Sequence, residues 1–158
     1  MRRKEREVKE LSEILNIINK CKIIRLGFND KGKIYIVPVN FGYDVINEKF
    51  LFFFHGAKAG RKYELIKQSD YIAYEMDCDY ELKEADEACK YSAYYSSIIG
   101  DGIVTELKDN EEKKKALNCI MKNATGKEDW NFPKIMLNIV GVFKIEVSNL
   151  SCKQNRIK

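Results

Sequence analysis

The apolar positions of the chain recur with two periods, and the first is that of a helix. Apolar residues three or four positions apart predict an amphipathic helix over about residues 5–20, with its buried face at Val8, Leu11, Leu15 and Ile18. A short helix is predicted over 60–68. A third helix is predicted to follow a capping Asp109 and to end at Gly126. Its expected core face is Ala116, Leu117, Ile120, Met121 and Ala124.

The second period is that of strands. Apolar and aromatic runs predict six strands, at residues 21–28, 33–43, 49–55, 71–80, 91–107 and 135–147. The turn at 29–32 ends on Gly32, which is free to take a positive φ. The run at 91–107 is expected to bend or bulge near Gly100 and Gly102. Consecutive antiparallel strands with few helices predict a mainly β (α+β) fold, a small six-stranded antiparallel barrel with flanking helices.

Composition is consistent with one folded domain over residues 1–158. Apolar residues make up 45% of the chain and charged residues 33%, so a core can form and disorder is not expected. The net charge of +4 is concentrated near the two ends, at Arg2, Arg3, Lys4, Lys153, Arg156 and Lys158. Nucleic-acid-binding proteins usually carry a denser basic stripe, so solvated termini are the favoured interpretation. Binding of a small anion stays open.

Five cysteines and one histidine do not form a metal-binding pattern. The cysteine count is odd, no CxxC occurs and the spacings are long, so we predict free, buried thiols and no metal site. The N-terminal residues MRRKEREVKE include no apolar segment of a secretory signal. No apolar run approaches the roughly 18–20 residues of a membrane span. We therefore expect a soluble, cytoplasmic protein.

The stretch FFFHGAKAGRKYEL, residues 52–65, contains the clearest candidate for a binding site. Gly56 and Gly60 allow a ligand to approach the backbone closely. A helix beginning near Gly60 directs free N–H groups toward the turn, where Arg61 and Lys62 add two cations. Cations are unfavourable at that helix end unless an anion binds there, which favours a phosphate site. The alternative is an exposed basic turn.

Three other features are compatible with a ligand but do not require one. Pro38 cannot donate a ladder hydrogen bond, so Val37–Asn40 forms either an edge strand or a backbone surface for a flat heterocycle. His55, the only histidine, lies at a strand end, where a hydrogen-bonding role is more common than catalysis. The hydroxyl groups of residues 94–97 lie on both faces of a strand. Trp130 can stack on a ligand or close a subunit interface.

Taken together and in this order, several segments resemble the pyridoxamine-phosphate-oxidase-like flavoproteins, and in particular their nitroimidazole-resistance (Nim) branch. The likeness covers nearly the whole chain. It is carried by RRKEREV (2–8), RLGFND (25–30), YIVPVNFGY (35–43), FFFHGAKAGRKYELI (52–66), YYSSIIGDG (94–102) and ALNCIMKNATGKEDWNF (116–132).

The resemblance implies an FMN-binding split β-barrel that forms a homodimer, with FMN at the subunit interface. It implies that Arg61 and Lys62, next to Gly60, hold the FMN phosphate, and that the backbone of Val37–Asn40 lines the isoalloxazine ring. Phe54 and His55 are then expected beside the ribityl chain and ring. Further contacts are implied for a neighbouring strand, at Tyr95, Ser96, Ser97 and Ile98, and across the dimer for Trp130. With the ring-lining residues Val37, Pro38, Val39 and Asn40, they complete the implied cofactor set.

The function that the resemblance implies is FMN-dependent reduction of small electrophilic or nitroaromatic compounds, with His55 orienting the substrate or supplying a proton. Oxidation of pyridoxamine phosphate is disfavoured, because residues 151–156 do not match the substrate-binding tail of that enzyme. Two alternatives stay open. One is a non-catalytic carrier or sensor of flavin or a related cofactor on the same fold. The other is a small basic adaptor for nucleic acid.

Overall fold

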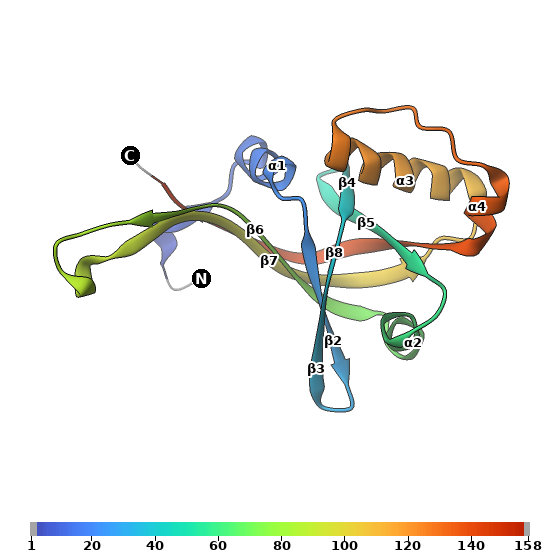
Figure 1. The fold of residues 1–158 in the computed structure, drawn as a ribbon, viewed down its shortest axis with the longest axis horizontal. Helices are drawn as coiled ribbons and strands as arrows, with labels where there is room; N and C mark the ends of the chain where they lie inside the picture. The colour runs from blue at the N-terminus through green and yellow to red at the C-terminus, as the bar shows by residue number, and fades with distance from the viewer. Residues whose placement is uncertain (1–2, 157–158) are drawn as a thin grey trace.

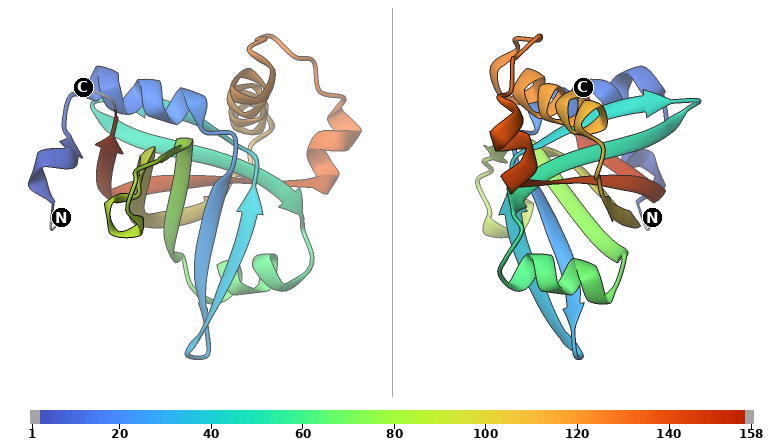
Figure 2. Two further views of the ribbon diagram at one scale, coloured as in Figure 1. Left: turned by 60° about the vertical axis from the view of Figure 1, so that its left-hand side comes forward. Right: turned by 90° about the vertical axis from the view of Figure 1, so that its right-hand side faces the viewer.

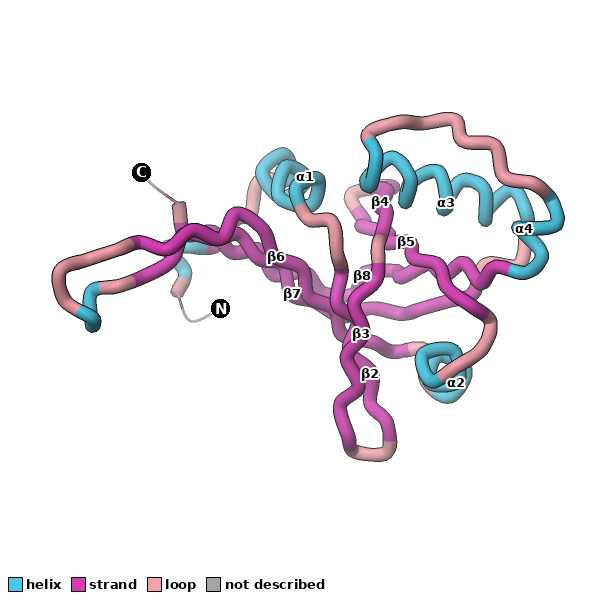
Figure 3. The backbone as a smooth tube through the Cα atoms, viewed as in Figure 1, coloured by secondary structure: helices cyan, strands magenta, loops and turns pink. Residues whose placement is uncertain are grey.

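The structure is a computed structural model that describes residues 3–156, so the terminal Arg2 and Lys158 lie outside the described residues. Its strands form one antiparallel eight-stranded sheet (Figures 1 and 3). The strands are β1 (Glu7–Val8), β2 (Ile24–Asp30), β3 (Lys33–Val39), β4 (Phe41–Ile46), β5 (Lys49–Ala57), β6 (Tyr71–Lys83), β7 (Ser92–Glu106) and β8 (Val140–Asn155). The helices are α1 (Leu11–Lys20), α2 (Arg61–Gln68), α3 (Asn110–Thr125) and α4 (Lys134–Ile139), with 3-10 turns at Lys4–Arg6 and Ala88–Lys90.

The sheet order is β3-β2-β6-β7-β8-β5-β4, and β1 pairs with β8. The mainly β fold with flanking helices is confirmed, but the prediction of six strands is wrong for two reasons. The predicted strand 33–43 breaks at Asn40 into β3 and β4, which pair with β2 and β5 at opposite ends of the sheet. The short β1 pairs with Lys153 and Cys152 of β8, and two residues are too few to give a period.

Two predicted element boundaries are also wrong. Val8 lies in β1, and α1 begins only at Leu11 because Glu10 is extended. Residues 135–139 form α4 instead of the start of the last strand, and β8 continues to Asn155. Both errors fall where a short apolar run fits a helix and a strand equally well.

The caps of α3 are confirmed. The carboxylate of Asp109 accepts hydrogen bonds from the N–H groups of Glu111 and Glu112, and Gly126 ends the helix with φ of 75°. The predicted core face is only partly correct: Ala124 is exposed and Met121 half-buried, whereas Lys113 and Asn123 are buried beside Ala116, Leu117 and Ile120. Two polar side chains, at positions that the predicted apolar face did not include, are thus buried on α3.

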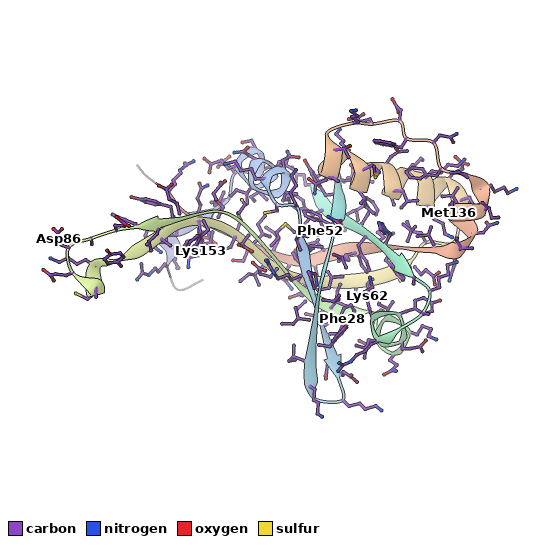
Figure 4. All side chains as sticks on the ribbon, viewed as in Figure 1. Phe28, Phe52, Lys62, Asp86, Met136 and Lys153 are labelled. Atoms are coloured by element: carbon purple, nitrogen blue, oxygen red, sulfur yellow. The ribbon has the colours of Figure 1, made fainter. Side chains whose placement is uncertain are left out.

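The three consecutive phenylalanines of β5 serve two cores. Phe52 and Phe54 are fully buried in the barrel interior, and Phe53 points the other way into the cluster beneath α3. Figure 4 labels Phe52 and Phe28 on the barrel side. Each such burial is worth roughly 1.5–3 kcal/mol. This alternation explains why the strand reads as continuously apolar.

The helices cover two ends of the barrel. Figure 2 shows α1 and α3 at one end of the sheet and α2 at the other, while β6 and β7 extend together as an arm away from the barrel. β6 reaches Lys83, three residues beyond the predicted strand end at residue 80. The bulge predicted in β7 is confirmed between Asp101 and Gly102. Among the helices described here, none has the length and apolar character needed to span a membrane.

Candidate functional site

The sheet is open between β3 and the end of β5, an opening called the split below. β3 pairs with β2 on one edge and lies at the end of the sheet order, so its other edge has no strand partner in the described chain. β4 pairs with β5 only as far as Phe54, so His55, Gly56 and Ala57 pair with β8 alone. The break at Asn40 therefore leaves two free backbone edges facing the same opening.

The N-terminus of α2 lies at this split. Gly60 is the N-cap, with φ of 90°, and no side chain caps the helix. The first intrahelical bond runs from the N–H of Glu64 to the carbonyl of Gly60. The N–H groups of the first turn are left without intrahelical partners, which makes this end a suitable anion site.

Arg61 lies on the β3 side of the split. Its Nε and Nη2 atoms donate to Oδ2 of Asp30 at 2.9 and 2.6 Å, and its guanidinium carbon lies 4.4 Å from the ring centroid of Tyr35. Asp30 and Tyr35 were not predicted as site residues. The sequence marked 29–32 only as a turn, and no local pattern links it to Arg61, 31 residues later.

Lys62 lies on the β5 side. Its Nζ is 5.2 Å from the ring centroid of Phe54, and a Cβ built on Gly56 would lie 2.7 Å from that Nζ. Lys62 is half-buried, and among residues 3–156 no carboxylate forms an ion pair with it. Burial lowers the pKa of Lys62. The ammonium of Lys62 thus lies against the backbone of Gly56 without an ion-pair partner among residues 3–156, and Lys62 is in the first turn of α2.

His55 lies one residue before Gly56, on the other face of β5. It pairs with Val142, whose side chain packs beneath α3, whereas Phe54 pairs with Phe143 in the barrel core. The imidazole is exposed. Partial desolvation, and then the charge of Lys62, lower its pKa below the ordinary value. At neutral pH His55 is therefore a neutral hydrogen-bonding group, able to accept a proton or to orient a ligand.

The edge position of Pro38 is confirmed. Its partner in β2 is Arg25, and β3 is the terminal strand of the sheet. The side chains of Val37 and Val39 pack against the barrel core, while Pro38 and Asn40 are exposed. Contact of this segment with a flat ring through its backbone stays a prediction.

Other predicted site residues are not brought together within one protomer. Phe54 is fully buried, and its ring stacks on that of Phe143 with the ring centroids 4.9 Å apart, so its side chain belongs to the core. Ser96 and Ile98 are also buried, and Oγ of Ser96 accepts a hydrogen bond from Gln154. Ile98 and Glu106 are eight residues apart along β7. Glu106 pairs with Phe143, which is next to Val142, the residue that pairs with His55.

That separation along β7 is about 26 Å at a rise of about 3.3 Å per residue. Tyr95 and Ser97 lie in the same distant part of the strand. Trp130 lies in the loop after α3, where its backbone N–H donates to Oδ1 of Asn118 and its indole N–H to the carbonyl of Lys127. The contacts predicted for the β7 residues therefore require a second protomer, and the contact predicted for Trp130 stays a prediction.

An antiparallel barrel left open beside an uncapped helix end defines the class as a split-barrel protein. A family model described as pyridoxamine 5'-phosphate oxidase matches residues 10–154. The chain belongs to this family, whose fold binds flavins. No curated protein matches the sequence.

Solved structures share the fold. A protein from Bacteroides thetaiotaomicron proposed to confer 5-nitroimidazole antibiotic resistance is 26% identical, with a TM-score of 0.80 over 94% of this chain and 86% of that one. The flavocytochrome Anf3 from Azotobacter vinelandii is 16% identical, with a TM-score of 0.80 over 99% and 72%. An FAD-binding protein from Mesorhizobium loti is 16% identical, with a TM-score of 0.64 over 94% and 96%. The two likenesses of 16% concern the fold alone.

Proposed function

We propose that this protein binds FMN in the split between β3 and β5 and acts as a reductase of small electrophilic compounds such as nitroaromatics. The observation that carries the proposal is the uncapped N-terminus of α2 beside the half-buried Lys62, which has no ion-pair partner among residues 3–156. The nitroimidazole-resistance likeness at 26% identity supports the substrate class.

The residues present fit a terminal phosphate. Gly56 leaves the space that the Lys62 ammonium fills, and the first-turn N–H groups of α2 supply neutral donors. Asp30 holds the Arg61 guanidinium with two hydrogen bonds, which orients it at the mouth of the split. Charge-assisted bonds of this kind contribute roughly 1.5–3 kcal/mol each. The free edge of β3 at Val37–Asn40 is then available to the ring through its backbone.

A bound flavin would supply the redox chemistry, and the protein would supply position and electrostatics. Lys62 and the helix end favour negative charge in the split. His55, neutral at pH 7, accepts a hydrogen bond from a substrate or passes a proton to it. A depressed pKa makes His55 a stronger proton donor once it is protonated, which suits a reduction that consumes protons.

We further propose that the protein is a homodimer formed through the outer face of β3, β2, β6 and β7. Large apolar side chains are exposed on this face, including Ile34, Ile36 and Ile99 at 73%, 62% and 58%. Ile36 lies opposite Gly27, which pairs with Ala73, whereas the row of Ile99 also holds the ion pair of Arg25 and Glu75. A face that combines large exposed apolar side chains with polar ones is typical of an interface. A second copy can bring residues such as Tyr95, Ser97 and Trp130 to the split.

The test is to add FMN to the purified protein, reduce the complex with dithionite and mix it anaerobically with 4-nitrobenzyl alcohol. The proposal predicts a flavin absorbance band that comigrates with the protein, bleaches on reduction and returns on mixing. Bound flavin that stays reduced would favour a carrier or sensor. A protein that binds no flavin would overturn the proposal.

A further inference from the structure

A cavity in the described part of the chain is lined by residues outside the predicted site, although the carbonyl of one of them, Lys22, accepts a hydrogen bond from the predicted site residue Asn40. It has a volume of about 680 Å³ and lies between the C-terminal ends of α1 and α3, over the edge strand β4 (Figure 1). None of the residues lining it belongs to the predicted flavin site. Its volume falls within the range of roughly 300–1,000 Å³ that is typical of small-molecule sites.

The two cations of the cavity rim are already committed. Nζ of Lys22 donates to the carbonyls of Asn19 and Asn123 at 3.0 and 2.7 Å, so one ammonium binds the last turns of both helices. Lys122 forms an ion pair with Glu128. The position of Lys22 shows that these helix ends, which carry partial negative charge, accept a cation.

Asn123 contributes a buried acceptor with no donor. Its side chain is 8% exposed, and its Nδ2 donates to the carbonyls of Cys21 at 3.3 Å and Phe41 at 3.0 Å. Those two bonds fix the orientation of the amide. The Oδ1 atom is buried and has no hydrogen-bond partner in the described chain. Leaving such an atom unpaired costs roughly 1–3 kcal/mol, so a ligand donor there would be favourable.

Asp44 contributes a carboxylate that no cation neutralises. One of its oxygens accepts from the N–H of Val45 at 2.8 Å, and among residues 3–156 it forms no ion pair. The hydroxyl of Tyr43 is used as a donor to Oδ1 of Asn19 at 2.8 Å. Among the residues lining the cavity, the groups without a full set of partners are therefore acceptors: the exposed carboxylate of Asp44 and the buried Oδ1 of Asn123.

We propose that this cavity is a binding site for a small organic cation that carries N–H donors, an alkylguanidinium or alkylammonium. Its N–H groups bond Oδ1 of Asn123 and the carboxylate of Asp44. Its alkyl stem packs against the partly buried Leu15 and Val45, which line the same cavity. The site does not depend on flavin binding.

The test uses three probes with one stem: butylguanidinium, 1-butanol and butyrate. Each is titrated into the ¹⁵N-labelled full chain while amide resonances are followed by NMR. Butylguanidinium is expected to give saturable shifts at Asp44, Val45 and the Asn123 side chain. Its affinity should exceed that of the other two probes by at least about tenfold, because one charge-assisted hydrogen bond contributes about that much. Equal affinities for the three probes, or shifts located elsewhere, would overturn the proposal.

Two variants separate the site from a structural role of Asn123. Asn123→Leu removes bonds to two other segments and can fail to fold, so the decisive variant is the exposed Asp44→Asn. It keeps the oxygen that accepts from Val45 and removes only charge. Butylguanidinium affinity should fall about tenfold in Asp44→Asn and stay unchanged in Glu84→Gln, a matched loss of charge in the distant arm. Wild-type affinity in Asp44→Asn would contradict the assignment.

Discussion

The ammonium of Lys62 lies against the backbone of Gly56, where a Cβ would be 2.7 Å from its Nζ. This contact places a cation that has no ion-pair partner among residues 3–156 at one side of the split, beside the last residues of β5. A residue larger than glycine at position 56 must displace the lysine, although it need not displace the strand. Gly56 is thus the small residue on which the position of this cation depends.

We therefore predict that Gly56→Ala weakens FMN binding about tenfold, the worth of one displaced charge-assisted bond, and changes the free energy of unfolding little. The lysine end is flexible and can move, so the fold tolerates the methyl group. FMN fluorescence quenching gives the affinity and urea titration gives the stability. Gly27→Ala is the control, because its Cβ would meet only ordinary contacts at 3.7 Å. Equal affinity in the two variants would argue against a role for Lys62.

The charge of Lys62 should also affect the pKa of His55. Desolvation and the Lys62 charge lower the His55 pKa in the folded state, so the unfolded chain binds the proton more tightly. Stability contributed by neutral His55 is present above the unfolded pKa, about 6.5. It is lost as the pH falls toward the lower folded value. We expect Lys62→Gln to raise the pKa of His55.

The measurement is unambiguous because the chain has a single histidine. Its ring proton resonance can be titrated by NMR in wild type and Lys62→Gln, with Lys67→Gln as a control from the far end of α2. A His55 pKa that is at or above its ordinary value in the wild type would contradict the structure.

The proposed interface predicts that one charge on the apolar face separates the protomers. Ile36→Lys should shift the protein from dimer to monomer, because a buried unpaired ammonium costs several kcal/mol. Light scattering after size-exclusion chromatography gives the mass. Ile46→Lys is the matched control, since Ile46 is 52% exposed on β4, outside this face. A dimer that persists in Ile36→Lys would exclude this face as the interface.

Gly42 gives a test of the fold itself. A Cβ there would lie 2.2 Å from the backbone carbon of Cys119, because α3 packs directly on β4. Neither backbone can yield as a side chain can, so Gly42→Ala should lower the free energy of unfolding by roughly 1–3 kcal/mol or more. Urea denaturation compared with Gly27→Ala provides the measurement. Equal stability of the two variants would mean that α3 is not seated as described.

Local pattern predicted the elements whose determinants are local. Asp109 and Gly126 mark the ends of α3, and the phenylalanine run marks β5, because caps and continuous apolar runs depend only on neighbouring residues. The break at Asn40 was missed because its cause is long-range: β3 and β4 have different partners at opposite ends of the sheet. The buried Lys113 was missed for the same reason, since its ammonium bonds the carbonyl of Leu137 in α4.

The candidate site divides in the same way. The glycines, Arg61 and Lys62 are close in sequence, and the structure keeps them together at the end of α2. Asp30 reaches Arg61 only through the packing of α2 against the β2–β3 hairpin, which no periodicity reports. Tyr95 and Ile98 were assigned by resemblance, and in a single protomer they lie in a distant part of the sheet.

The most direct test is FMN titration of the double variant Arg61→Ala, Lys62→Ala, followed by absorbance and fluorescence. Loss of two charge-assisted contacts should weaken binding by roughly 2–4 kcal/mol, while Lys67→Ala on the same helix should bind as the wild type does. Undiminished FMN affinity in the double variant would contradict the assignment of the phosphate to the N-terminus of α2.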